Sequence, residues 1–278
     1  MQTPAQIKEM VKQKYSEIAL QDKTTNASSC CGATSSCGDV YNLMSDEYTG
    51  LQGYAPEADL GLGCGLPTQF ALIKKGDTVI DLGSGAGNDC FVARHETGES
   101  GKIIGIDMTP EMIIKARENA EKLGFNNVEF RIGDIEKMPV TANTADVVVS
   151  NCVLNLVPDK AQAFCEINRV LKAGGHFSIS DIVLSGTLPE KLQQAAEMYA
   201  GCVSGAIQKE EYLNLIIEHG FINIKIQKEK AIVVPDEILK DYLTIEEITS
   251  YKQSGTGIYS ITVYAEKSGN CTPGGGCC

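Results

Sequence analysis

Hydrophobic positions recur along the chain with two different periods, and the change between them separates the predicted elements. Residues 5–20 carry apolar side chains at helical spacing among charges, which predicts one amphipathic helix. Residues 26–39 are polar and rich in Gly and Ser, which predicts a loop. From Leu72 onward, short apolar runs alternate with segments of helical period.

This alternating region predicts strand-helix repeats around a parallel sheet. The predicted strands are DTVIDLG, KIIGIDM, VEFRIGD, ADVVVSN and HFSISDIV, and the predicted helices are PEMIIKARENAEKLG and KAQAFCEINRVLKAGG. Strands that alternate with helices in this way are typical of an α/β fold with a doubly wound sheet.

Beyond residue 184 the pattern predicts a smaller α+β lobe. Helical spacing covers residues 188–204, 208–219 and 235–250, and the strand-like stretches are INIKIQKEKAIVV and YSITVYAEK. Because both stretches alternate in polarity, we expect them to close the sheet as an antiparallel pair. The tail SGNCTPGGGCC has no periodicity, and we expect it to be mobile.

Composition and charge narrow the class of function. A chain of 278 residues with 43% hydrophobic content can bury a large core. The formal net charge of −12 disfavours a surface that follows nucleic-acid phosphates. The chain shows neither an apolar run of membrane-spanning length nor a signal-peptide core, so we expect no membrane partner and a cytoplasmic location. An enzyme acting on a small molecule fits these properties best.

The chain contains eleven cysteines, an unusual number for a protein expected in the cytoplasm, and they need a chemical explanation. Cytosolic thiols are kept reduced and the number is odd, so a static disulfide framework is disfavoured. Catalysis, transient redox chemistry and binding of a soft ion remain as explanations.

Glycines and strand-end acids predict a nucleotide site. The segment VIDLGSGAGND places three glycines after a strand, but the third comes one residue too early for the dinucleotide pattern G-x-G-x-x-G. Three consecutive strands each end on an acid, namely Asp81, Asp107 and Asp134. Since the carboxyl ends of such strands face one crevice, the acids suit a cationic nucleoside with free ribose hydroxyls.

The segments D-x-G-x-G-x-G, GIDMTPEM, GDIEKMP and RVLKAGGHF, within residues 76–183, resemble the class I S-adenosylmethionine-dependent methyltransferases. The resemblance implies the Rossmann-like fold of that class and S-adenosylmethionine as cofactor. It implies that Gly83, Ser84 and Gly85 hold the methionine part, Asp107 and Met108 the ribose and adenine, and Asp134 and Ile135 the adenine. Asp81, Gly87 and Asn151 complete the implied cofactor-binding set.

Cys152 directly follows the fourth predicted strand, at the cofactor end of the sheet. It could be a buried small hydrophobe, half of a disulfide, a nucleophile, the methyl acceptor or a ligand. None of the three histidines stands in a Cys/His motif, which favours the ligand. Cys64 in LGLGCGLP and Cys202 in YAGCVSGA also lie among small residues. Dispersed thiolates without a C-x-x-C pair favour a trivalent metalloid over zinc.

Over essentially its whole length the chain resembles the arsenite S-adenosylmethionine methyltransferases. The matching stretches are GLGCGLPT, DLGSGAGNDCF, GIDMTPEM, VVVSNCVLNLVPDK, RVLKAGG and GCVSGA, with the Cys-rich N-terminal segment and the GGGCC tail. The resemblance implies that Cys152 and Cys202 bind arsenic(III) and that Cys64 is a third ligand and a redox partner. Its N-terminal partner is one of Cys30, Cys31 and Cys37, of which we favour Cys37.

The implied activity is methylation of arsenite, its thiol conjugates and methylated arsenite, as arsenic detoxification. A cellular dithiol or thiol, such as thioredoxin or glutathione, would return electrons. The implied divisions are residues 1–47 (N-terminal helix and Cys-rich segment), 48–184 (cofactor-binding core), 185–267 (arsenic-binding lobe that completes the sheet) and 268–278 (tail).

Two other functions fit weaker features of the sequence. One is a methyltransferase acting on carbon or oxygen of a lipid or quinone, and the other is a metalloid scavenger without turnover. Cys90 and Cys165 fall inside predicted helices and are expected to be core residues. The tail cysteines are expected to act as a flexible scavenger or to have no role. Tyr48 and Tyr54 either line the site or pack against the core domain.

Overall fold

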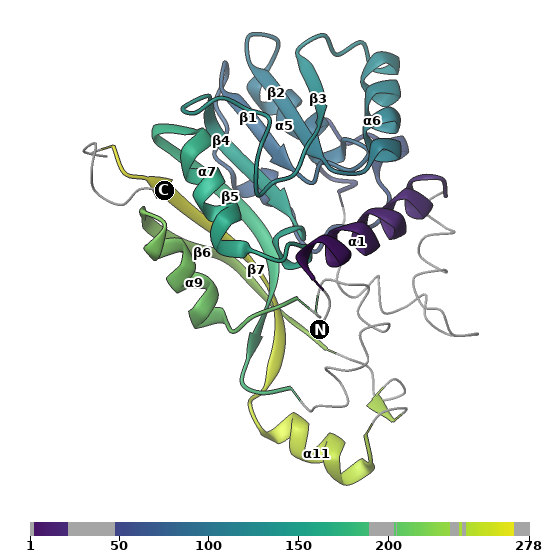
Figure 1. Cartoon of the computed structure of the whole chain (residues 1–278), viewed down its shortest axis with the longest axis vertical. Helices are drawn as coiled ribbons and strands as arrows, with labels where there is room; N and C mark the ends of the chain where they lie inside the picture. The colour runs from purple at the N-terminus through teal and green to yellow at the C-terminus, as the bar shows by residue number, and fades with distance from the viewer. Residues whose placement is uncertain are drawn as a thin grey trace.

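The computed structural model contains one seven-stranded sheet with the strand order β3-β2-β1-β4-β5-β7-β6. It describes residues 3–21, 48–188, 203, 205–233, 239–240 and 243–269. Strands β3, β2, β1, β4 and β5 run parallel, and β7 is antiparallel to both β5 and β6. Figure 1 shows the helices on both sides of this sheet, which is the doubly wound α/β architecture that the sequence predicts.

The strands lie where the apolar runs place them. Their bounds are β1 (Thr78–Leu82), β2 (Lys102–Asp107), β3 (Val128–Ile132), β4 (Ala145–Asn151), β5 (Leu171–Ser185), β6 (Phe221–Ile232) and β7 (Gly257–Lys267). Both faces of the central strands are covered, so these strands are almost continuously apolar rather than alternating. The predicted antiparallel closure by the last two strands is confirmed, with β7 inserted between β5 and β6.

The helices agree with the predicted segments at most positions. Their bounds are α1 (Pro4–Ala19), α4 (Pro67–Phe70), α5 (Asn88–Thr97), α6 (Pro110–Lys122), α7 (Lys160–Val170), α9 (Lys209–Glu218) and α11 (Ile245–Gln253), with 3-10 turns at Pro56–Ala58 and Leu154–Leu156. The predictions for 26–39 and for the tail fall largely outside the described residues, as does most of 188–204.

Two predicted helices differ in extent from the structure. The helix expected over residues 235–250 is not continuous, because residues 240, 243 and 244 are not helical and a capping box of Thr244 and Glu247 starts α11 at Ile245. The segment KAQAFCEINRVLKAGG was expected to be helical throughout, but α7 ends at Val170 and Leu171 starts β5. Leu171 is fully buried and pairs with Ala145, so the sheet overrides the helical pattern.

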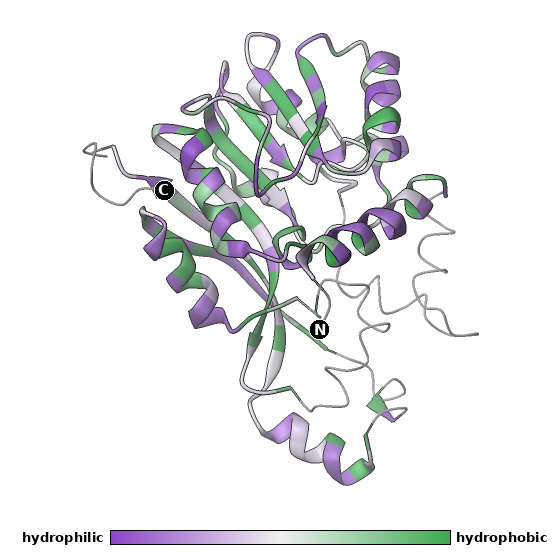
Figure 2. Cartoon of the chain, in the orientation of Figure 1, coloured by the Kyte–Doolittle hydropathy of each residue, from purple (hydrophilic) through white to green (hydrophobic). Residues whose placement is uncertain are grey.

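The hydrophobic core lies on both faces of the sheet. Figure 2 shows hydrophobic residues concentrated along the central strands and hydrophilic ones on the outer faces of the helices. A separate buried cluster at one end of β5 and β7 contains Cys64, Cys152, Ile182, Val203 and Ile258. In the part of the chain that the structure describes, no helix is long and apolar enough to cross a membrane.

Candidate active site

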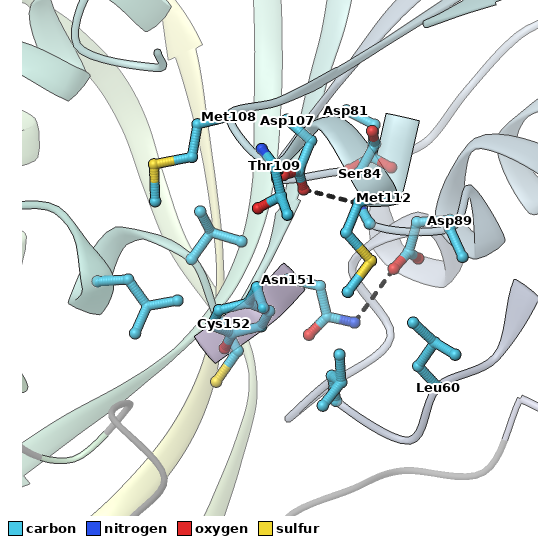
Figure 3. Close-up of a pocket in the computed structure, with 18 of the residues that line it drawn as sticks. Leu60, Asp81, Ser84, Asp89, Asp107, Met108, Thr109, Met112, Asn151 and Cys152 are labelled. Carbon is cyan, nitrogen blue, oxygen red and sulfur yellow. Dashed lines mark hydrogen bonds between the residues drawn. The ribbon is translucent and has the colours of Figure 1, made fainter. Parts of the chain in front are cut away.

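A pocket opens at the carboxyl ends of β1, β2 and β4, and α1 contributes to its wall (Figure 3). It encloses about 1060 Å³ of space without atoms, part of which is open to solvent. Its polar and sulfur-bearing lining residues include Lys8, Tyr15, Tyr48, Asp59, Asp81, Ser84, Asn88, Asp89, Asp107, Met108, Thr109, Met112, Asp134, Asn151 and Cys152. None of the three histidines lines this pocket.

The glycine loop is held to β2 by backbone hydrogen bonds. The amides of Gly83 and Ser84 both donate to the Ile106 carbonyl. The Asp107 carboxylate accepts from the Gly85 amide at 3.0 Å and from the Thr109 amide at 2.8 Å. Asp107 therefore shapes the loop as well as facing the pocket.

Two positions in this loop require glycine. Gly83 has a φ of +66°, and a Cβ there would lie 2.4 Å from a methyl of Val153. Gly87 has a φ of +101°, and a Cβ there would meet the rings of Phe91 and Phe130. Gly83 lines the pocket, whereas Gly87 starts helix α5 and is not part of the pocket wall.

Buried acids give the pocket its electrostatic character. Burial raises the pKa of Asp81, and the neighbouring charge of Asp89 raises it further. Burial also raises the pKa of Asp89 and Asp107, although their hydrogen bonds oppose the shift. Since carboxylates removed from water seek cations and hydrogen-bond donors, the pocket favours a ligand that supplies both.

Two buried polar atoms in the pocket lack a hydrogen-bond partner among the described residues. They are Ser84 Oγ and Asn88 Oδ1. A Cβ placed on Gly85 would meet only the Met112 sulfur, at 4.0 Å. Open space over a backbone loop, with unsatisfied polar atoms beside it, fits a polar ligand such as the amino-acid end of S-adenosylmethionine.

Cys152 stands at the wall of the pocket in a strained backbone conformation. Its φ is +62°, in the left-handed region that non-glycine residues rarely adopt, and its amide donates to the Ser180 carbonyl at 2.8 Å. The residue is 4% exposed. This conformation places the Cys152 side chain in the cluster with Cys64, which is 2% exposed.

Comparison with known proteins decides the family. Residues 73–220 match the model of a methyltransferase domain. The arsenite methyltransferase of Halobacterium salinarum is 39% identical over 91% of this chain and 66% of its own length. That of Aquipseudomonas alcaligenes is 34% identical over 84% of this chain and 68% of its own length. The chain belongs to the arsenite methyltransferase family.

A solved structure agrees with this assignment. The arsenic(III) S-adenosylmethionine methyltransferase of Chlamydomonas reinhardtii is 31% identical, with a TM-score of 0.63, and the match covers 84% of this chain and 74% of that one. The chain spans about two thirds of the length of the two curated relatives described above.

Most residues that the family resemblance implied as cofactor-binding lie together at the pocket. They are Asp81, Gly83, Ser84, Gly85, Asp107, Met108, Asp134, Ile135 and Asn151. Of the implied arsenic ligands, Cys152 lines the pocket and Cys64 lies in the adjoining cluster. Cys202, Cys37 and the other N-terminal and tail cysteines lie outside the described residues. Among the described residues, no group of three His, Cys, Asp or Glu is placed to hold a metal ion.

Sequence reasoning missed several pocket residues. Helix α1 contributes Lys8, Val11 and Tyr15, although nothing in its amphipathic pattern connects it to a site built mainly by distant segments of the chain. Lys8 donates to Asp134 at 2.5 Å and also to Glu136, which ties α1 to the pocket rim. Asn88 and Asp89 directly follow the glycine loop, and that adjacency was a usable signal.

The remaining cysteine and tyrosine predictions have mixed outcomes. Cys90 is fully buried, as expected, and its thiol donates to Asp81 at 3.2 Å. Cys165 is half-buried and disulfide-bonded, so the prediction that it is a core residue is wrong. It lies one residue past Phe164 on α7, turned away from the apolar face. Tyr48 lines the pocket, and Tyr54 donates to Asp59 in its wall at 2.9 Å.

Replacing Asp107 by Ala is expected to weaken S-adenosylmethionine binding by about 1 to 3 kcal/mol, because the ligand and the Gly85 and Thr109 amides all lose an acceptor. Titration calorimetry measures this. Asp77→Ala, which removes an acid at the start of β1 outside the pocket wall, is the control and should bind normally. Unchanged affinity of the Asp107 variant would show that this acid does not face the ligand.

The Gly63-Cys64-Gly65 turn has no room for side chains at its glycines. A Cβ on Gly63 would lie 2.6 Å from Asn151 Nδ2, and one on Gly65 would lie 2.5 Å from Ser180 Oγ. Gly65→Ala is therefore expected to lower the free energy of unfolding by about 1 to 3 kcal/mol in denaturant titrations. Gly50→Ala, which meets only open space, should change it by less than about 0.5 kcal/mol. Equal effects at the two positions would contradict the packing explanation.

Proposed function

We propose that this chain transfers methyl groups from S-adenosylmethionine to trivalent arsenic held by cysteine thiolates. The observation that carries the proposal is that Cys152 stands in the wall of the same pocket as Asp107 and the glycine loop. The names of the curated relatives and of the Chlamydomonas reinhardtii enzyme support arsenite as the substrate.

The chain's own residues bind and orient the cofactor. Gly83, Ser84 and Gly85 would hold its methionine part, Asp107 and Met108 its ribose and adenine, and Asp134 and Ile135 its adenine. When bound, S-adenosylmethionine supplies a methyl group on a positively charged sulfur. Burial raises the pKa of the pocket acids, and a cation bound beside them would oppose that shift by stabilising their charged form.

Arsenic(III) would be bound by Cys64, Cys152 and Cys202. Thiolates are soft donors that suit this ion. Cys64 and Cys152 lie in one buried cluster, and Val203, which follows Cys202 in the chain, belongs to the same cluster. Three-coordinate arsenic keeps a lone pair, so the protein's task is to hold that lone pair towards the methyl group. Such positioning catalysis needs no general base, consistent with a pocket that no histidine lines.

Methyl transfer must be followed by a reduction. The arsenic lone pair forms the new As–C bond, the S–C bond breaks, and its electron pair stays on sulfur, so arsenic becomes pentavalent. Two thiolates can return two electrons by forming a disulfide, with Cys64 and Cys37 as our proposed pair. Thioredoxin or glutathione would reopen it by thiol exchange. We propose that this cycle operates in the cytoplasm as arsenic detoxification.

Incubation of the full chain with arsenite, S-adenosylmethionine and a thiol reductant, followed by arsenic speciation, tests the proposal. Formation of methylated arsenic is the expected result. Binding of arsenite without methylated product would support a metalloid scavenger instead. Methylation of a lipid or quinone, with arsenite unchanged, would support the carbon or oxygen methyltransferase.

A further inference from the structure

The side chain of Asn151 bridges the end of β4 and the Cys64 turn. Its Oδ1 accepts from the Cys64 amide at 3.1 Å, and its Nδ2 donates to the Gly65 carbonyl at 2.9 Å. One side chain thus holds the backbone on both sides of the Cys64 side chain. Asn151 is also the residue directly before Cys152, so a single residue connects two of the thiols in the buried cluster.

The amide orientation of Asn151 follows from its surroundings. Besides Gly65, Nδ2 lies 3.2 Å from Asp89 Oδ2 (Figure 3). It also donates to the Tyr48 hydroxyl. A flipped amide would place Oδ1 against the Gly65 carbonyl and the Asp89 carboxylate, and Nδ2 against the Cys64 N–H. Both contacts would be repulsive, so only one orientation satisfies the site.

In this orientation, contacts within the protein use the hydrogen-bonding capacity of the amide. Nδ2 has two hydrogens and three acceptors within reach, and Oδ1 already accepts from Cys64. Asn151 lines the pocket, but its polar atoms are directed to the Cys64 turn and to Asp89 rather than left open for a ligand. Ser84 Oγ and Asn88 Oδ1, by contrast, have no hydrogen-bond partner in the part of the chain that the structure describes.

A second layer of contacts holds Asn151 itself. Asp89 accepts from the Tyr48 hydroxyl at 2.7 Å and from Thr68 Oγ1 at 3.2 Å, and it is only 8% exposed. The turn is also held from its other side, because Ser260 Oγ donates to the Cys64 carbonyl at 2.6 Å. The Cys64 backbone is therefore fixed by β7 on one side and by Asn151 on the other.

We infer that Asn151 is a positioning residue that fixes Cys64 relative to Cys152, rather than a polar ligand of the cofactor. The inference rests on the proposed function for its consequence in turnover, but not for the geometry itself. A three-thiolate site tolerates little displacement of one sulfur, so release of the turn would remove Cys64 from the arsenic site while Cys152 keeps its place directly after β4.

Asn151→Asp tests this with nearly unchanged shape. The carboxylate still accepts from the Cys64 amide, but it replaces the donor to Gly65 by an oxygen and faces Asp89. In the absence of arsenic, iodoacetamide is expected to alkylate Cys64 about tenfold faster in this variant than in wild type, as measured by peptide mass spectrometry. The loss of one hydrogen bond makes opening of the turn easier by about that factor. Alkylation of Cys90 should be unchanged, which distinguishes release of the turn from general destabilisation. Asn151→Ala makes the same test without a new charge, should the Asp variant not fold.

Turnover and cofactor binding complete the test. Asn151→Asp should slow methylation of arsenite more than that of monomethylarsenite. In a Cys64→Ser background it should cause no further loss of methylation rate. Its S-adenosylmethionine affinity should stay within about threefold of wild type. A cofactor affinity that falls in parallel with turnover, or a loss that adds to that of Cys64→Ser, would overturn the inference. So would an unchanged rate of Cys64 alkylation. Wild-type protein without arsenic methylation would refute the proposed function alone, because the alkylation measurement would still decide the role of Asn151.

Discussion

Replacing Cys152 by Ser is expected to lower arsenite methylation by more than about a hundredfold, the scale of loss when a reacting group is no longer held in place. A hydroxyl at neutral pH is a hard, neutral donor and replaces a thiolate poorly. Serine is similar in size, and the backbone N–H of residue 152 can still donate its hydrogen bond to the Ser180 carbonyl. The fold and the pocket should therefore remain. Speciation of the arsenic products measures turnover, and calorimetry should give an S-adenosylmethionine affinity near that of wild type.

Cys90 provides the matched control for this variant. It is also buried near the pocket, where it donates to Asp81, but it lies outside the proposed arsenic site. Cys90→Ser should retain turnover, whereas Cys202→Ser should lose it as Cys152→Ser does. Wild-type turnover in either of the last two variants would remove that cysteine from the proposed ligand set.

Cys64→Ser is expected to impair the first methylation far more than the second. Arsenite offers three exchangeable positions and can take three thiolates, whereas monomethylarsenite has one position occupied by carbon and can take only two. The third thiolate therefore matters only for the unmethylated ion. The measurement compares rates on the two substrates separately, with excess dithiol so that reduction is not limiting.

The same experiment separates the two proposed roles of Cys64. Cys152→Ser, measured in parallel, should lose both methylations, since its sulfur is needed with either substrate. Equal losses on the two substrates in Cys64→Ser would count against a third-ligand role. Cys64 would then be a redox cysteine, or a structural residue of the tightly packed Gly63-Cys64-Gly65 turn.

The sequence determined the features that depend on local pattern. Apolar runs and the turns between them located the strands, because side-chain periodicity follows directly from backbone geometry. Parallel strands bring their carboxyl ends to one edge, so the acids Asp81, Asp107 and Asp134 could be expected at one site. The structure places all three at the pocket. The family could also be predicted, because its motifs lie within short contiguous segments.

Only the tertiary structure decided which distant groups meet. Asn151 holds the Cys64 turn across 87 positions of the chain, and α1 covers a pocket built from β1, β2 and β4. It also decided that Gly87, the N-cap of α5, lies outside the pocket wall and that Cys165 is turned away from the apolar core. Hydrogen bonds between remote segments leave no periodic signal in a sequence, because the hydrophobic pattern around each residue reflects only the helix or strand in which it lies. Packing alone brings these partners together.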